Sequence, residues 1–187
     1  MPKRVFFLDT STIVHRYVTP KEDACSKLIR RRIDRLFTDA AEHPNSIVLQ
    51  IPNICMAECA GAFARLCFEE RIYGSGEKAK LAFWSLREAL LKDVKTSRLV
   101  HSYELKRLHF IDIEDIFVRD HELAAPRGEK HLSSHDALIL SMANEYRLAH
   151  SADRTKIVTD DRRIADFCRS AGDAFPEAVR ISTQNPL

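Results

Sequence analysis

Acidic residues follow two short apolar runs that are far apart in the sequence. Asp9 comes directly after residues 5–8, and Asp160 and Asp161 come directly after residues 156–159. Both runs have the composition of buried strands. In open α/β sheets ligands bind at the carboxyl ends of the strands, so carboxylates placed there are candidates for binding or catalysis.

Two further acids, Glu58 and Asp136, lie in segments with the apolar spacing of helices. Small or apolar residues stand three and four positions away from each of them. This spacing predicts that both carboxylates share the core-facing stripe of their helix. A charged group on that stripe is costly unless it is paired with an opposite charge or bound to a metal ion.

Each of these acids also has an ordinary explanation. Asp9 suits a turn, and Glu58 can pair with Arg65 or reach solvent. The negative charge of Asp136 would be stabilised by the dipole at the start of its helix. An aspartate before Arg162 can be the N-cap of the next helix. A single shared site would explain all of these acids together. Carboxylates that converge there would need a cation to offset their repulsion.

Carboxylates in this arrangement suit a hard cation such as Mg²⁺, which binds one or two carboxylates and keeps several waters. Thr10, Ser11 and Thr12 follow Asp9, and such short hydroxyl side chains can cap a helix or hold a metal-bound water. The sequence has neither a glycine-rich phosphate loop nor a GxSxG motif. The predicted chemistry is therefore hydrolysis of a phosphodiester by metal-bound water.

The overall composition fits a single soluble domain. The chain has 187 residues, of which 45% are hydrophobic and 30% are charged, and its formal net charge is +2. This charge is too small to identify a partner. No apolar run is long enough to cross a bilayer, and the first residues do not resemble a signal peptide. We therefore expect a cytoplasmic protein.

Short apolar runs alternate with segments of helical spacing along the whole chain. Strands are expected at about residues 5–8, 47–51, 108–113, 157–159 and 178–181. Helices are expected at about residues 24–41, 53–71, 77–92, 114–124, 134–149 and 162–171. The alternation predicts an α/β protein in which helices cover both faces of a mostly parallel sheet. We expect one domain over residues 1–187, with a helical elaboration at about residues 71–106.

Four segments that contain the acids resemble the acidic motifs of PIN-domain nucleases, in the family's order. They are Phe7-Leu8-Asp9-Thr10-Ser11-Thr12-Ile13-Val14, Met56-Ala57-Glu58, His135-Asp136-Ala137-Leu138-Ile139 and Thr159-Asp160-Asp161-Arg162-Arg163-Ile164. By this pattern the chain is most similar to VapC-type toxins of bacterial toxin–antitoxin pairs. The resemblance covers about residues 5–168, and the chain is longer than the compact members of the family.

The resemblance implies a three-layer α/β/α sandwich that cleaves single-stranded RNA with Mg²⁺ or Mn²⁺. It implies that the catalytic and metal-binding residues are Asp9, Glu58, Asp136 and Asp161. The family spacing from Thr159 selects Asp161, with Asp160 as the second choice, and Ser11 and Thr159 are expected as supporting hydroxyls. The resemblance also implies a homodimer and a small antitoxin protein that inhibits it.

Two other functions remain open on the sequence alone. A PIN-like module can bind RNA or a protein partner without cutting RNA. A phosphatase or phosphoacceptor domain would use Asp9 as its nucleophile, but that chemistry normally needs a second aspartate where Ser11 stands. All four acids of the motifs are present, which favours the nuclease.

Cysteine and histidine residues give only weak indications of zinc. The chain has 5 cysteines at irregular spacing, and Cys55 and Cys59 are one helical turn apart without a second pair. We expect these cysteines to be small buried side chains. His131 and His135 are expected to be loop histidines near the start of a helix and not zinc ligands.

Overall fold

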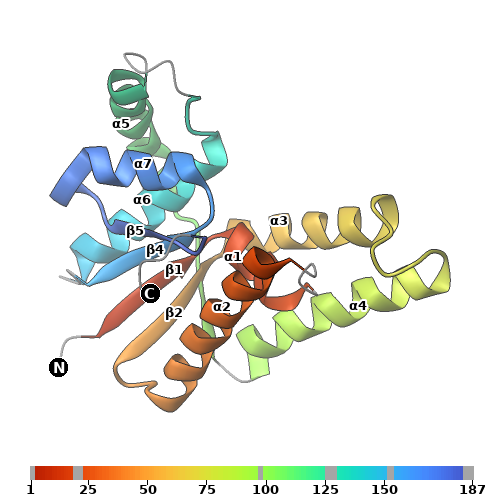
Figure 1. Ribbon diagram of the computed structural model, residues 1–187. Helices are drawn as coiled ribbons and strands as arrows, with labels where there is room; N and C mark the ends of the chain where they lie inside the picture. The colour runs from red at the N-terminus through yellow and green to blue at the C-terminus, as the bar shows by residue number, and fades with distance from the viewer. Residues whose placement is uncertain (1–2, 19–22, 97–98, 125–129, 151–153, 183–187) are drawn as a thin grey trace.

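Five parallel strands form the central sheet in the part of the chain that the computed structural model describes, residues 3–18, 23–96, 99–124, 130–150 and 154–182 (Figure 1). The strands are β1 (Arg4–Leu8), β2 (Ile47–Pro52), β3 (Val100–Tyr103), β4 (Thr155–Thr159) and β5 (Glu177–Arg180). Their order in the sheet is β3-β2-β1-β4-β5. The four residues that end β1 are buried, as expected for a central strand covered on both faces.

Helices cover both faces of this sheet and make three layers (Figure 1). One layer contains α1 (Thr10–Tyr17), α2 (Ala24–Glu42), α3 (Asn53–Ala64) and α4 (Glu77–Leu91). The other contains α5 (Arg107–Ala124), α6 (Ser134–Ala149) and α7 (Arg162–Ala171). The strands progress in one direction from β1 to β3 and in the other from β4 to β5. Right-handed connections then place the two groups of helices on opposite faces.

Three short helical segments complete the described elements. Two are π-helical and continue α3 and α4, at η1 (Arg65–Glu69) and η2 (Lys92–Thr96). The third is the 3₁₀ turn η4 (Gly172–Ala174), which follows α7. Gly172 has a positive φ of 59° there, a backbone conformation that glycine adopts without steric cost. The sequence correctly predicted the end of α7 at this glycine.

The parallel strands β1 and β4 are neighbours in the sheet, and the order in which strands are added reverses between them, from β1 toward β3 on one side and from β4 toward β5 on the other. Connections leave these two strands toward opposite faces, so a crevice opens at their carboxyl ends. Asp9 follows β1, and Asp160 and Asp161 follow β4. The architecture is therefore the predicted α/β/α sandwich with a parallel sheet, and it brings the two groups of aspartates to one edge.

The strand predicted at residues 108–113 is wrong. These residues belong to the long helix α5, and the edge strand is β3, which pairs with β2. In α5 the histidine His109 is fully buried, whereas Leu108, Phe110 and Ile111 are exposed. The apolar residues on which the strand prediction rested are exposed to solvent. The buried stripe of the helix contains the polar residue His109 instead.

The expected helical elaboration contains an element of the sheet. Within residues 71–106, α4 and η2 are helical, but β3 is the edge strand. The helical part thus ends at Thr96 and not at residue 106. In Figure 1, α3 and α4 extend away from the sheet as an arm. Whether this arm is an addition to a smaller domain stays a prediction.

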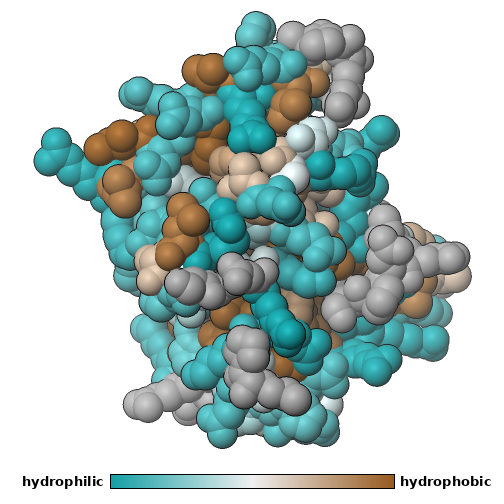
Figure 2. Space-filling view, turned by 90° about the vertical axis from the view of Figure 1, so that its left-hand side faces the viewer, coloured by the Kyte–Doolittle hydropathy of each residue, from teal (hydrophilic) through white to brown (hydrophobic). Residues whose placement is uncertain are grey.

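The surface is mainly hydrophilic on the side where α7 lies, with separate apolar patches (Figure 2). Large exposed apolar residues include Leu81 and Trp84 on α4 and Ile111 and Val118 on α5. None of the helices in the described ranges is long and apolar enough to span a membrane.

Candidate metal centre

Asp9 occupies the central position of the candidate site. It caps the N-terminus of α1, and its exposed fraction is only 7%. Its Oδ1 accepts a hydrogen bond from the backbone N–H of Thr10 at 2.6 Å. Its Oδ2 accepts hydrogen bonds from the hydroxyls of Ser11 at 2.8 Å and Thr159 at 2.7 Å. These donors fix the orientation of the carboxylate.

The same hydroxyls connect the two strand ends. The Ser11 hydroxyl accepts the backbone N–H of Asp160 at 3.0 Å, and the Thr159 hydroxyl accepts the backbone N–H of Asp161 at 2.9 Å. Each hydroxyl therefore donates to Asp9 and accepts from the β4–α7 connection. This network gives Ser11 and Thr159 the supporting contacts that the sequence suggested for them.

Burial raises the pKa of Asp9 above its ordinary value. The hydrogen bonds from Thr159, Ser11 and Thr10 act in the opposite direction, and the negative charge of Asp136 adds to the increase. A nearby cation would therefore stabilise the ionised form of Asp9. The charge of Asp136 acts on Asp9 although the two residues lie on different helices.

Asp136 lies in the first turn of α6, where its exposed fraction is 8%. It forms a capping box with Ser133, whose hydroxyl and backbone N–H donate to Asp136 Oδ2 at 2.7 and 2.8 Å. Nη2 of Arg163 lies 3.3 Å from the same oxygen. The predicted inward position of Asp136 is confirmed, and Ser133 is the N-cap of its helix.

Arg163 connects Asp136 to Asp161. Asp161 is the N-cap of α7 and accepts the backbone N–H of Arg163 at 2.7 Å. Nη2 of Arg163 lies 2.6 Å from Asp161 Oδ2, so one guanidinium group neutralises part of both carboxylates. Burial alone would raise the pKa of Asp161, but hydrogen bonds and charge from Arg163 lower it below its usual value.

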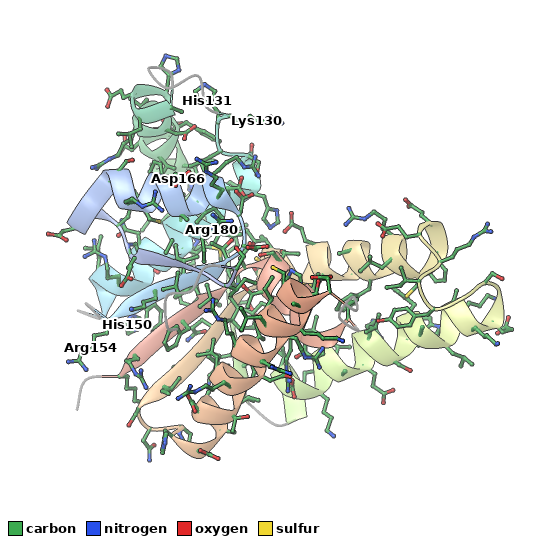
Figure 3. All side chains as sticks on the ribbon, viewed as in Figure 1. Lys130, His131, His150, Arg154, Asp166 and Arg180 are labelled. Carbon is green, nitrogen blue, oxygen red and sulfur yellow. The ribbon has the colours of Figure 1, made fainter. Side chains whose placement is uncertain are left out.

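Asp160 has different neighbours. Its Oδ1 is buried and has no hydrogen-bond partner within the described ranges. Nη2 of Arg180, at the end of β5, lies 3.9 Å from this oxygen (Figure 3). Of the two consecutive aspartates, Asp161 is the one that shares a partner with Asp136.

Glu58 does not lie on the core-facing stripe of α3, and that prediction is wrong. The buried stripe consists of Cys55, Cys59 and Phe63, and the Glu58 side chain is 41% exposed. Its Oε2 nevertheless accepts a short hydrogen bond from the hydroxyl of Thr10, the residue after Asp9. Glu58 therefore reaches the site from the surface.

Two neighbours of Glu58 were not predicted to take part in the site. Nε2 of His135 lies 3.0 Å from Oε2 of Glu58, and Cys55 is fully buried one turn before Glu58 on α3. Burial, followed by the negative charges of Asp9 and Glu58, raises the pKa of the Cys55 thiol. The sequence indicated their involvement only by position, because His135 directly precedes Asp136 and Cys55 stands three residues before Glu58.

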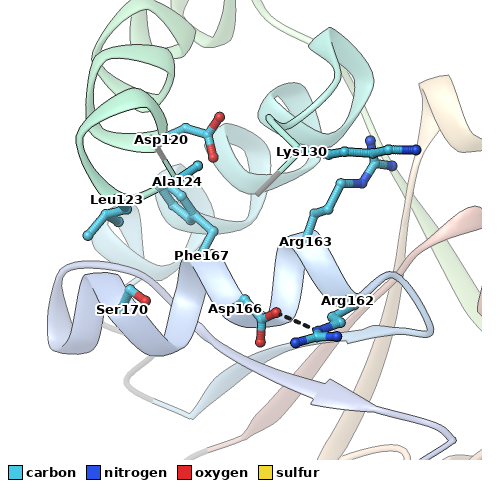
Figure 4. A pocket seen from close by; sticks show the side chains of 9 residues that line it. All are labelled: Asp120, Leu123, Ala124, Lys130, Arg162, Arg163, Asp166, Phe167 and Ser170. Carbon is cyan, nitrogen blue, oxygen red and sulfur yellow. Dashed lines mark hydrogen bonds and ion pairs between the residues drawn. The ribbon is translucent and has the colours of Figure 1, made fainter. Parts of the chain in front are cut away.

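A pocket of about 320 Å³ adjoins the site where Arg163 lines it (Figure 4). Positive charge comes from Lys130, Arg162 and Arg163, and the ring of Phe167 forms part of the wall. Arg162 pairs with Asp166 at 3.0 Å. The pocket thus offers cations suited to phosphates, whereas Phe167 is only 3% exposed and belongs to the core.

The residue types of the acidic site suit a hard divalent cation, although in the described part of the chain no three of these four acids have carboxylate oxygens within 4.8 Å of one another. Asp9, Asp136 and Asp161 are tied together by shared hydroxyl and guanidinium partners, and Glu58 joins them through Thr10. All these ligands offer carboxylate oxygen, which Mg²⁺ and Mn²⁺ prefer. Burial raises the pKa of Asp9, and a bound cation would lower this pKa again by stabilising the ionised carboxylate.

Comparison with known proteins leaves the family open. No protein-family model matches the chain, and no curated protein matches it. A chain in the crystal structure of VapBC2 from Rickettsia felis bound to a DNA fragment from their promoter is similar in structure. Its sequence identity is 13%, its TM-score is 0.49, and the match covers 94% of this chain and 98% of that chain. So distant a likeness supports no argument about function.

Proposed function

We propose that the protein is a metal-dependent endoribonuclease that hydrolyses phosphodiester bonds of single-stranded RNA. The observation that carries this proposal is the connected group of carboxylates at the sheet edge where β1 and β4 end. Asp9 is buried there, and the negative charge of Asp136 contributes to its raised pKa. The resemblance of the four motifs to PIN-domain nucleases supplies the substrate class.

In this proposal Asp9, Glu58, Asp136 and Asp161 hold Mg²⁺ or Mn²⁺. When bound to these residues, the ion would provide an activated water and would neutralise charge on the phosphate. Ser11 and Thr159 hold the Asp9 carboxylate in place through Oδ2. The Glu58 side chain is 41% exposed, which leaves room for it to adjust its position when the ion binds.

The pocket beside Arg163 would hold a nucleotide next to the bond that is cut. Lys130 and Arg162 would contact its phosphate. By the motif resemblance, we further propose that the protein is the toxin of a toxin–antitoxin pair, with a small antitoxin as partner. The homodimer and the cytoplasmic location stay predictions.

Cleavage of a labelled single-stranded RNA by the purified protein tests this function. Cleavage should require Mg²⁺ or Mn²⁺ and stop in chelator. Asp9→Asn, Asp136→Asn and Asp161→Asn should each reduce the rate on the order of 100-fold or more, since each weakens the hold on the metal ion whose positive charge stabilises the transition state. Asp160→Asn is the matched control, because Asp160 faces Arg180, and its effect should be much smaller.

A binding module without catalysis is the second candidate function. It is favoured by Arg163, which already provides positive charge to Asp136 and Asp161. Binding of the same RNA, without cleavage in either metal ion, would support this candidate. Cleavage that survives Asp9→Asn would contradict the proposed nuclease site.

A further inference from the structure

A thiol, a carboxylate and an imidazole meet beside the acidic site. Cys55 and Glu58 are one turn apart on α3, and His135 lies in the first turn of α6. Their ligand atoms all lie within 4.8 Å of one another. Nε2 of His135 is buried and makes no hydrogen bond with any described residue, although Glu58 Oε2 is only 3.0 Å away.

We propose that Cys55, Glu58 and His135 form a second metal site, which takes a soft divalent ion such as Zn²⁺. Thiolate and imidazole ligands favour zinc over magnesium, whereas oxygen ligands alone favour magnesium. Three protein ligands leave a fourth position for water, as in zinc sites that are open to a further ligand. The unsatisfied Nε2 of His135 would gain a partner in the ion.

The geometry needs only a small adjustment to bind zinc. Ligands of a tetrahedral zinc ion lie roughly 3.3–3.7 Å apart, given metal–ligand bonds of about 2.0–2.3 Å. Here Nε2 of His135 and Oε2 of Glu58 are 3.0 Å apart, and no two of the three ligand atoms are more than 4.8 Å apart. Glu58 can make the adjustment because its side chain is 41% exposed, whereas Cys55 is held in the core.

This second site shares Glu58 with the acidic site. Oε2 of Glu58 faces both His135 and the Thr10 hydroxyl beside Asp9, so zinc bound to this oxygen would compete for it with a Mg²⁺ ion held by Asp9 and Asp136. Zinc should therefore inhibit cleavage that magnesium supports. This inhibition depends on the proposed nuclease function, but the binding of zinc does not.

Titration of the full-length, chelator-treated protein with Co²⁺ tests the site without any RNA. A cobalt ion bound to the Cys55 thiolate should give a thiolate charge-transfer band in the near ultraviolet and tetrahedral bands in the visible range. Zn²⁺ should displace the cobalt and abolish both. His135→Ala should weaken cobalt binding by more than about 100-fold, since loss of a mere supporting partner costs about 10–100-fold.

Cys55→Ser should abolish the thiolate band, and Cys59→Ser is its matched control. Cys59 is fully buried on the same stripe of α3, one turn further, so it tests for non-specific effects on packing. The proposal is overturned if wild-type protein gives no thiolate band, if Cys55→Ser or His135→Ala keeps it unchanged, or if Cys59→Ser loses it. Cobalt binding without RNA cleavage would contradict only the nuclease function.

Discussion

At the scale of single residues, the site depends on carboxylates that each have two roles. Asp9, Asp136 and Asp161 all lie at helix N-termini, where they accept backbone or hydroxyl hydrogen bonds. Helix N-termini favour negative charge, so the fold can place these acids close together before any cation binds. Capping and metal binding are therefore compatible functions of the same side chains.

Arg163 should compete with a metal ion for the acidic site. Arg163→Gln removes the positive charge between Asp136 and Asp161, and the affinity for Mn²⁺ should rise by about tenfold by Coulomb attraction in a partly exposed site. Calorimetric titration with Mn²⁺ measures this directly. Arg162→Gln is the matched control, since Arg162 pairs with Asp166, and an equal rise in that variant would contradict the role of Arg163.

The sequence predicted the individual acids better than their partners. Asp9, Asp136 and the helix cap formed by Asp161 were recognisable because each stands next to an apolar run or stripe. Glu58 was placed on the wrong face, because the buried stripe of α3 is one position away and begins at Cys55. Arg163 was not predicted, since its importance comes from Asp136, which is distant in the sequence.

At the scale of elements, the β1–α1 and β4–α7 connections form one unit. Ser11 and Thr159 each accept a backbone N–H from the β4–α7 connection while donating to Asp9. The position of the Asp9 carboxylate thus depends on a strand that is distant in the chain. Such hydroxyl contacts cannot be assigned from sequence without knowing that β1 and β4 are neighbours.

Thr159→Val should remove the hydroxyl that links the β1–α1 and β4–α7 connections, while the side chain keeps almost the same size and shape. The valine leaves the Asp161 N–H without its acceptor and removes one donor to Asp9. We expect a loss of about 1–3 kcal/mol in unfolding free energy and of about 10–100-fold in cleavage rate. Thermal unfolding and RNA cleavage are the two measurements.

The control for this variant is Thr38→Val on α2. Thr38 is exposed, and its hydroxyl bonds only the carbonyl of Asp34 within its own helix, among the contacts described. It should leave both the unfolding free energy and the cleavage rate nearly unchanged. If Thr159→Val behaves like Thr38→Val, the hydroxyl network does not position Asp9.

Helix α5 shows why some elements could not be predicted. Its buried stripe includes His109, Ile116, Asp120 and Ala124, and two of these four side chains are polar. Asp120 accepts the backbone N–H of Leu132 at 3.0 Å, so burial of its carboxylate is compensated. An apolar pattern cannot reveal a stripe whose polar members are satisfied by residues from other elements.

At the scale of the whole molecule, the strand order determines where chemistry can occur. The order β3-β2-β1-β4-β5 places the carboxyl ends of the parallel strands β1 and β4 side by side, at the point where the strand order reverses. From the alternation of strands and helices the sequence predicted a mostly parallel sheet with the acids at one edge, but it did not predict the strand order, and it missed β3. The α3–α4 arm projects beside this edge (Figure 1), and its role does not follow from the sheet.

Binding of Mn²⁺ to chelator-treated protein, measured by calorimetry, tests the central claim most directly. Wild-type protein should bind the ion saturably, and Asp9→Asn and Asp136→Asn should each lose most of the affinity, whereas Asp160→Asn should retain it. Because burial raises the pKa of Asp9, its charge destabilises the metal-free fold at neutral pH. The melting temperature of metal-free Asp9→Asn should therefore be equal or higher, which shows that lost binding is not unfolding. Absent binding in the wild type, or undiminished binding in folded Asp9→Asn, would contradict the account.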